Sequence, residues 1–137
     1  MACCGLGTAE ETSIAGAKRV ALRGYDPVSY FTDGHPEKGA SEFSFAFDDA
    51  IYWFKSSEHR AMFAADPVRY APQYHGYCTL AASMGVKFEA DPEAWTIFDG
   101  RLFVFGSTTG VSVFKQNPPA IVDKADANWE KLRAGQQ

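Results

Sequence analysis

The chain has 137 residues, of which 46% are hydrophobic, so it is long and apolar enough to form one folded domain rather than a disordered chain. Its formal charge of −4 argues against nucleic acid or an anionic membrane as a partner, because both attract basic surfaces. No apolar run approaches the roughly 20 residues that a membrane-spanning helix needs.

Residues 1–17 are small and polar, and we expect a flexible N-terminal tail there, followed by one domain over 18–137. The alternation of Val20 and Leu22 with less apolar neighbours predicts a short strand. The segment 42–54, "EFSFAFDDAIYWF", predicts a β-hairpin, because its apolar residues alternate on both sides of Asp48-Asp49.

The segment 55–67, "KSSEHRAMFAADP", predicts a helix that a serine caps and Pro67 ends. A short Ala-rich helix is expected over 77–85. A second hairpin is expected over 94–105, with Asp99-Gly100 at its tip.

Two helices are expected near the C-terminus, a brief one that carries Phe114 and a last one over about 119–133. No internal repeat is apparent. The predicted fold class is α+β, with two antiparallel β-hairpins packed against about four short helices in a single compact domain.

The segment "QYHGYC", residues 73–78, carries the first candidate site. His75 and Cys78 have an H-x2-C spacing that a turn can present to one ion. His59 on the preceding helix could be a third ligand, and nearby methionine thioethers suit copper. The metal would be copper or zinc. The alternative is structural, with His75 in a turn, His59 at the edge of the core and Cys78 as a small packed residue.

Cys78 also precedes a predicted helix, whose dipole favours a thiolate, and His75 or His59 could act as its base. No sequence feature identifies a substrate for such a thiol enzyme. Asp48 and Asp49 have an ordinary explanation as turn residues. The role of Cys3 and Cys4 at the N-terminus stays open.

Four stretches of the chain form a recognisable pattern: "GYDPVSYFTDGHPEKG", "EFSFAFDDAIYWFKSSEHRAMFAADPVRYAPQYHGYC", "DPEAWTIFDGRLFV" and "KADANWEKL". Together they resemble the YHS domain family in its single-domain bacterial form. The resemblance covers roughly residues 20–133. It implies a small binding protein, with short relatives presumed to bind metal, and a periplasmic or secreted location. A cytoplasmic location is the alternative.

The chain departs from the short YHS domains at their cysteine positions. Ser29 and Lys55 stand at two of them, and neither side chain is a soft metal ligand. His59 stands at the third and keeps the capacity to bind metal. Cys78 lies on the "Q-Y-x-G-Y-C" motif of the single-domain relatives, where His75 occupies the variable position. The resemblance thus favours Cys78 with His59 as the metal-binding pair.

Three functional hypotheses follow. The first is a metal-binding protein that uses Cys78 and His59, with His75 as a further ligand. The second is a metal-free module that binds a small ligand or a protein partner in an aromatic cleft. Its tyrosines would be drawn from this set: Tyr25, Tyr30, Tyr70, Tyr74 and Tyr77. The third is a thiol enzyme.

Overall fold

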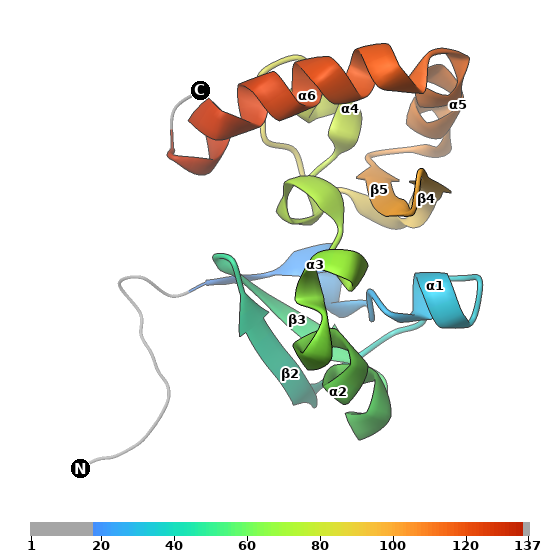
Figure 1. Cartoon of the computed structure of the whole chain (residues 1–137), viewed down its shortest axis with the longest axis vertical. Helices are drawn as coiled ribbons and strands as arrows, with labels where there is room; N and C mark the ends of the chain where they lie inside the picture. The colour runs from blue at the N-terminus through green and yellow to red at the C-terminus, as the bar shows by residue number, and fades with distance from the viewer. Residues whose placement is uncertain (1–17, 136–137) are drawn as a thin grey trace.

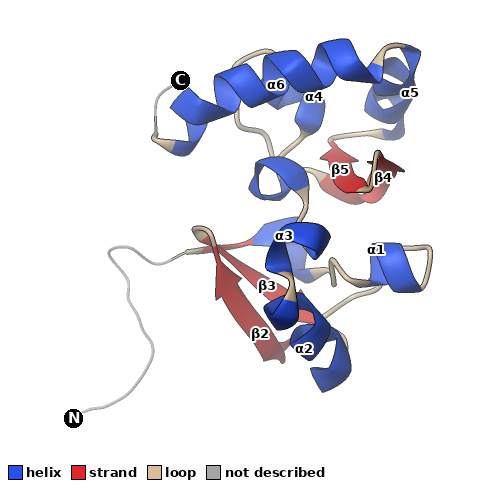
Figure 2. Cartoon of the chain, in the orientation of Figure 1, coloured by secondary structure: helices blue, strands red, loops and turns tan. Residues whose placement is uncertain are grey.

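Two small β-sheets and the helices that follow them form two lobes stacked on each other (Figure 1). The structure is a computed structural model, and it describes residues 18–135. We call residues 18–72 the first lobe and residues 73–135 the second. The distribution of helices and strands between them is seen in Figure 2. The α+β class and the single compact domain predicted from the sequence are confirmed. The predicted tail, 1–17, lies outside the described residues.

The first lobe is a three-stranded sheet with its helices. The strands stand in the order β1-β3-β2, with β1 parallel and β2 antiparallel to β3. The strands are β1 (Arg19–Val20), β2 (Ala40–Phe47) and β3 (Ala50–Phe54). The helices are the 3-10 turn η2 (Ala21–Gly24), α1 (Ser29–Thr32), α2 (Ser57–Ala65) and α3 (Pro67–Tyr70).

The second lobe is a two-stranded antiparallel sheet covered by the C-terminal helices. The strands are β4 (Asp91–Phe98) and β5 (Arg101–Phe105). The helices are the 3-10 turn η3 (Gln73–Gly76), α4 (Thr79–Ser83), α5 (Thr108–Gln116) and α6 (Pro118–Arg133). Pro118 and Pro119 begin α6 rather than interrupting a helix, because proline fits the first turn, where no backbone donor is needed.

The second lobe repeats the plan of the first, which the sequence analysis did not predict. In each lobe a 3-10 turn is followed by a hairpin with a register shift and then by a nine-residue helix. Ser56 caps α2 and Ser107 caps α5, 51 positions later, and both have nearly the same backbone angles. Both helices then end at a residue followed by proline, Asp66 and Asn117.

The repeat extends to the packing of the aromatic residues. In the first lobe, the Phe63 ring lies 5.0 Å from Tyr52 and 5.1 Å from Phe54, between ring centroids. In the second lobe, Phe114 lies 5.0 Å from Phe103 and 5.3 Å from Phe105. All three positions are again shifted by 51. The two lobes therefore bury one phenylalanine of their helix against equivalent strand residues.

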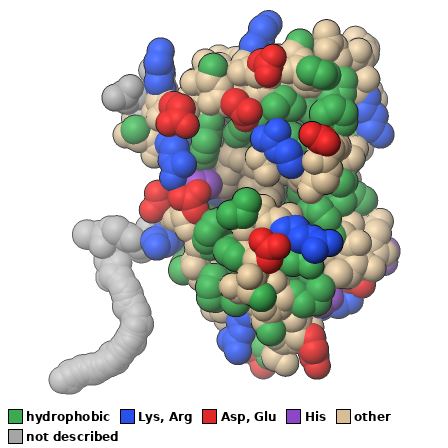
Figure 3. All heavy atoms as spheres, viewed as in Figure 1, with side chains coloured by type: hydrophobic (Ala, Val, Ile, Leu, Met, Phe, Trp, Pro, Cys, Tyr) green, Lys and Arg blue, Asp and Glu red, His purple; other side chains and the backbone are tan. Residues whose placement is uncertain are grey.

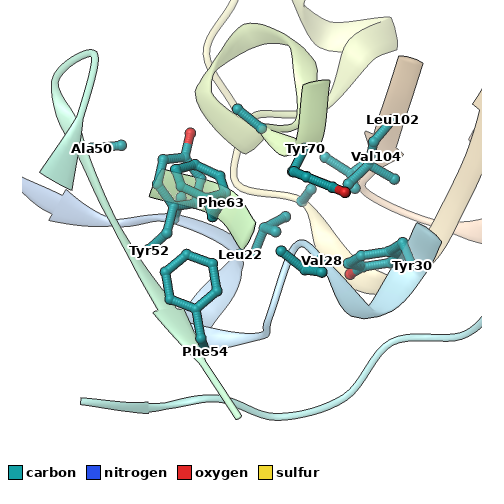
Figure 4. Close-up of a cluster of buried hydrophobic side chains, with 13 residues drawn as sticks. Leu22, Val28, Tyr30, Ala50, Tyr52, Phe54, Phe63, Tyr70, Leu102 and Val104 are labelled. Carbon is teal, nitrogen blue, oxygen red and sulfur yellow. The ribbon is translucent and has the colours of Figure 1, made fainter. Parts of the chain in front are cut away.

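Strand β5 belongs to both cores. Leu102 and Val104 are fully buried in the cluster of the first lobe, where Figure 4 shows them beside Tyr70. Phe103 and Phe105, on the opposite face of the strand, belong to the cluster of the second lobe. Successive side chains of a strand point to opposite faces, so a strand between two cores is apolar at consecutive positions. This explains the run "LFVF".

Candidate functional site: a cleft between the lobes

A cleft of about 200 Å³ lies where the two lobes meet. The first lobe lines it with Phe47, Asp48, Tyr52, Val68, Ala71 and Pro72. The second lobe lines it with Gln73, Tyr74, His75, Asp126 and Trp129. The space-filling view in Figure 3 shows this face of the molecule hollowed between its two lobes. The cleft thus combines aromatic rings with a few polar groups, as small-molecule sites do.

Turn η3 positions Tyr74 and His75 in the cleft by a strained backbone. Their φ angles are +56° and +53°, in the left-handed region that costs a non-glycine residue roughly 1–2 kcal/mol. Arg19 holds the turn from the other lobe, since its Nη1 donates to the His75 carbonyl at 2.6 Å. Its guanidinium also lies 3.7 Å from the centre of the Tyr77 ring and binds both oxygens of Glu89.

The His75 side chain contacts Trp129 and Asp48. Its ring stands edge-on to Trp129 at 4.9 Å between centroids, and its side chain is only 12% exposed. Its Nε2 lies 3.1 Å from the Asp48 carboxylate, which can only accept, so Nε2 carries a proton. Burial lowers the pKa of His75 below its usual value, although Asp48 opposes the shift. The imidazole is therefore uncharged at neutral pH.

Asp48 reaches the cleft from the tip of the β2–β3 hairpin. Asp48 and Asp49 both have positive φ, as the two-residue turn requires, which confirms the predicted tip. The Asp48 carboxylate accepts from Arg133 at 2.7 Å as well as from His75. Partial burial opposes ionisation, but the hydrogen bond from His75 and the charge of Arg133 outweigh it and lower the pKa of Asp48. With His75 neutral, Arg133 is the charged partner.

On the opposite wall, Tyr74 donates its hydroxyl proton to Asp126 Oδ1 at 2.9 Å. Burial and the neighbouring Asp126 raise the pKa of Tyr74, so the phenol stays protonated. The Tyr74 ring packs against Trp129 at 5.9 Å between centroids. Arg101 donates to Gln73 and lies 3.6 Å from Asp126. The second lobe thereby fixes this wall before any ligand arrives.

Tyr52 supplies a further polar group to the lining of the cleft. Its residue is 1% exposed, and no side-chain hydrogen bond joins its hydroxyl to another residue within 18–135. The hydroxyl is not among the buried unpartnered side-chain atoms of these residues, which are Ser29 Oγ and Thr79 Oγ1. Burial raises the pKa of Tyr52, so the hydroxyl is a neutral donor and acceptor that a ligand in the cleft can use.

His59, a predicted metal ligand, lies elsewhere in the first lobe. Its Nδ1 is 2.7 Å from Oδ2 of Asp26, a carboxylate with no exposed surface. The backbone N–H groups of Val28 and Lys55 donate to the same carboxylate. The second imidazole nitrogen, Nε2, lies 3.4 Å from the Thr32 hydroxyl. The imidazole is thus held by the protein itself.

Cys78 is a buried free thiol in the second lobe, where it lines a separate cavity of about 410 Å³. The repeat relates Cys78 to Asp26 and Gly110 to His59, with shifts of 52 and 51 positions. Gly106 and Gly110 both line the Cys78 cavity. The pair Asp26–His59 in the first lobe therefore corresponds to Cys78 and Gly110 in the second. The metal hypothesis combined His59 from the first lobe with Cys78 from the second.

The predicted metal ligands do not gather into one cluster. Within residues 18–135, no group of three or more His, Cys, Asp or Glu side chains is arranged to hold a metal ion. His59, His75 and Cys78 thus form no three-ligand site, because His75 is bound to Asp48, His59 to Asp26, and Cys78 lines its own cavity. Binding of copper or zinc by Cys78 and His59 stays a prediction.

The predicted tyrosines are also distributed over the fold. Of the proposed cofactor-binding set, only Tyr74 lines the cleft. Tyr77 lies behind η3 beneath Arg19, and Tyr25 packs at the edge of the first core. Tyr30 and Tyr70 are buried in that core.

The sequence analysis missed four residues on which the site depends. Asp48 was explained as a turn residue, and Tyr52, Asp126 and Trp129 were not singled out as site residues. The turn pattern accounts for Asp48, and the apolar stripe of the last helix accounts for Trp129. Neither pattern therefore indicates that the residue lines a cleft. Only the contact of the hairpin tip with η3 and α6 shows their second role.

Comparison of the chain with family models, with curated protein sequences and with solved structures finds no match. Within residues 18–135, no helix combines the length and the apolar character that crossing a membrane requires.

Proposed function

We propose that the protein is a small binding module that takes a low-molecular-weight ligand in the cleft between its lobes. The observation that carries the proposal is the cleft of about 200 Å³ itself, in which the Tyr52 hydroxyl has no side-chain hydrogen bond to another described residue. Around it, Tyr74 and Trp129 offer ring surface, and two carboxylates offer acceptors. A few polar groups among apolar walls are typical of a ligand site.

The rigidity of the walls supports the same function. Tyr74 and His75 are held in strained backbone conformations by contacts from both lobes. Strained residues concentrate at binding sites, where the surrounding structure maintains them. A site held in this way loses little conformational entropy when a ligand binds.

A screen of small polar and aromatic fragments by two-dimensional NMR of ¹⁵N-labelled protein tests the proposal. We expect several fragments to shift amide signals around η3 and the Asp48 turn. The variant Tyr52→Phe should weaken fragments that hydrogen-bond the hydroxyl by roughly fivefold, equivalent to about 1 kcal/mol. Tyr25→Phe, which alters a tyrosine outside the cleft, is the matched control. A screen in which no fragment perturbs the cleft would overturn the proposal.

The metal prediction needs its own measurement on the same protein. Metal analysis of purified wild type, Cys78→Ser and His59→Ala after loading with copper or zinc compares the bound metal directly. Stoichiometric metal that both variants lose would establish the Cys78–His59 pair. Equal and negligible metal in all three proteins would eliminate it.

A further inference from the structure

We propose that the ligand of the cleft is a small organic cation, an ammonium compound of about the size of choline. The inference rests on the proposed function and adds the chemical class of the ligand. It follows from the charges that face the cleft, the aromatic rings that enclose it, and its volume.

The formal charges on the lining are both negative. They belong to Asp48 and Asp126, and no lysine or arginine lines the cleft. His75, the remaining titratable nitrogen there, is kept neutral because burial lowers its pKa. Arg133 and Arg101 contact the two carboxylates without lining the cleft, so they orient the acceptors and temper their charge. An anionic ligand would meet two carboxylates and no cationic wall.

The carboxylate oxygens retain exposed surface that a cation can contact. Asp126 Oδ1 accepts from Tyr74, and no hydrogen bond reaches its Oδ2 from the described residues. Its side chain is 51% exposed, and that of Asp48 is 38% exposed. An ammonium group can approach both from the open side of the cleft. The Tyr52 hydroxyl can bind a hydroxyl or other polar group at the far end of the same ligand.

The rings favour the same ligand class. Phe47, Tyr52, Tyr74 and Trp129 all line the cleft. A cation over an aromatic face gains roughly 0.5–2 kcal/mol, and aromatic cages are a known solution for ammonium groups. A neutral apolar ligand would gain the ring contact but nothing from the carboxylates. The expected order of affinity is therefore cation, neutral, anion.

The volume limits the size. A cleft of 200 Å³ equals the liquid volume of about seven water molecules at about 30 Å³ each. It can enclose a group of choline size, whereas a nucleotide or a peptide of several residues would extend out of it. A single ammonium with one short polar arm fits these dimensions.

Three isosteric probes test the inference by NMR titration: choline, its uncharged analogue 3,3-dimethylbutan-1-ol, and the anion 3,3-dimethylbutanoate. We expect choline to bind at least tenfold more tightly than the alcohol, with the anion weakest. Shifts should map to η3 and the Asp48 turn. Raising the salt concentration should weaken choline and leave the alcohol unchanged.

Charge-removing variants identify the groups responsible. Asp48→Asn and Asp126→Asn should each weaken choline threefold to tenfold without affecting the alcohol. Asp99→Asn is the matched control, because Asp99 occupies the position of Asp48 in the other hairpin and does not line the cleft. Equal losses for choline and the alcohol would show a structural effect and contradict the charge argument.

The outcomes separate the two proposals. If neutral fragments or the alcohol bind in the cleft as tightly as cations or more so, the cation inference is wrong and the binding function stands. If neither the probes nor the fragment screen perturb the cleft, the binding function itself fails. Selective binding of choline or of other ammonium fragments supports both.

Discussion

The carboxylate of Asp26 and the imidazole of His59 are joined by a 2.7 Å hydrogen bond inside the first lobe. Asp26 has no exposed surface, and it also accepts from the backbone N–H groups of Val28 and Lys55. One side chain thereby ties the start of α1, the end of β3 and helix α2 together. Its counterpart in the second lobe is Cys78, which offers no comparable acceptor.

Asp26→Ala should destabilise the protein by about 3–5 kcal/mol, because it leaves buried donors and His59 without their acceptor. Urea denaturation followed by tryptophan fluorescence measures the loss. Asp33→Ala, which removes an exposed carboxylate bound to Lys55, should remain near wild type. Equal losses in the two variants would contradict the structural role of Asp26.

The stability of the protein should fall as the pH decreases through the histidine range. Because burial lowers the pKa of His75, the unfolded chain binds more protons than the folded protein between pH of about 6.5 and the lowered value. The free energy of unfolding therefore decreases as the pH decreases. Asp48, whose pKa is also lowered, contributes only at more acid pH, near and below its usual value of about 3.8.

His75→Asn should reduce that dependence, because asparagine is neutral and tolerates the left-handed backbone at this position. Urea denaturation at pH 7.5 and 5.5 gives the free energies of unfolding of both proteins. His35→Asn, at an exposed loop position, should keep the wild-type dependence. The interpretation is wrong if His75→Asn and wild type lose equal stability between the two pH values.

Arg19→Ala should destabilise the junction of the lobes by about 2 kcal/mol, because one guanidinium contacts Glu89, the His75 carbonyl and the Tyr77 ring. Arg19→Lys should restore only part of the loss, since an ammonium cannot reproduce the two-pronged contact with Glu89. Thermal denaturation compares both with Lys18→Ala, an exposed neighbour. Full rescue by lysine would show that charge alone matters.

Gly39→Ala should destabilise the first hairpin by about 3 kcal/mol or more. A Cβ atom at this position would lie 2.6 Å from the Trp53 carbonyl carbon and 2.8 Å from the Gly24 oxygen, both backbone atoms. Gly34→Ala is the control, because its Cβ would meet nothing and only its φ of +78° opposes the change, by about 1–2 kcal/mol. Similar losses in both variants, measured by urea denaturation, would contradict the steric argument.

The sequence was sufficient to predict the turns and the helix cap, because local chemistry determines these structures. Asp48-Asp49 and Asp99-Gly100 adopt the expected turns, because the alternating residues on either side leave each hairpin one register. Ser56 caps its helix as expected. By contrast, Leu22 leaves the predicted strand for a left-handed turn, and tertiary contacts alone account for such a conformation in a leucine.

The candidate site could not be predicted in the same way. Its walls join Asp48, His75 and Arg133, which are far apart in the chain, and no periodicity relates them. The metal hypothesis compared residue types, and it could not show that His59 is already bound by Asp26. The repeat escaped detection because its identical residues, such as Ser56 and Ser107, are scattered among positions that hold different side chains, such as His59 and Gly110.

The two-sided burial of β5 makes the lobes interdependent. A chain cut after Pro72 would leave the first fragment without Leu102 and Val104, and therefore with an open core. The second fragment would lack the surface that covers one face of its strand. We expect each fragment to be unfolded alone and an equimolar mixture to recover the circular dichroism spectrum of the intact chain. The two halves of the repeat would thus fold together or not at all.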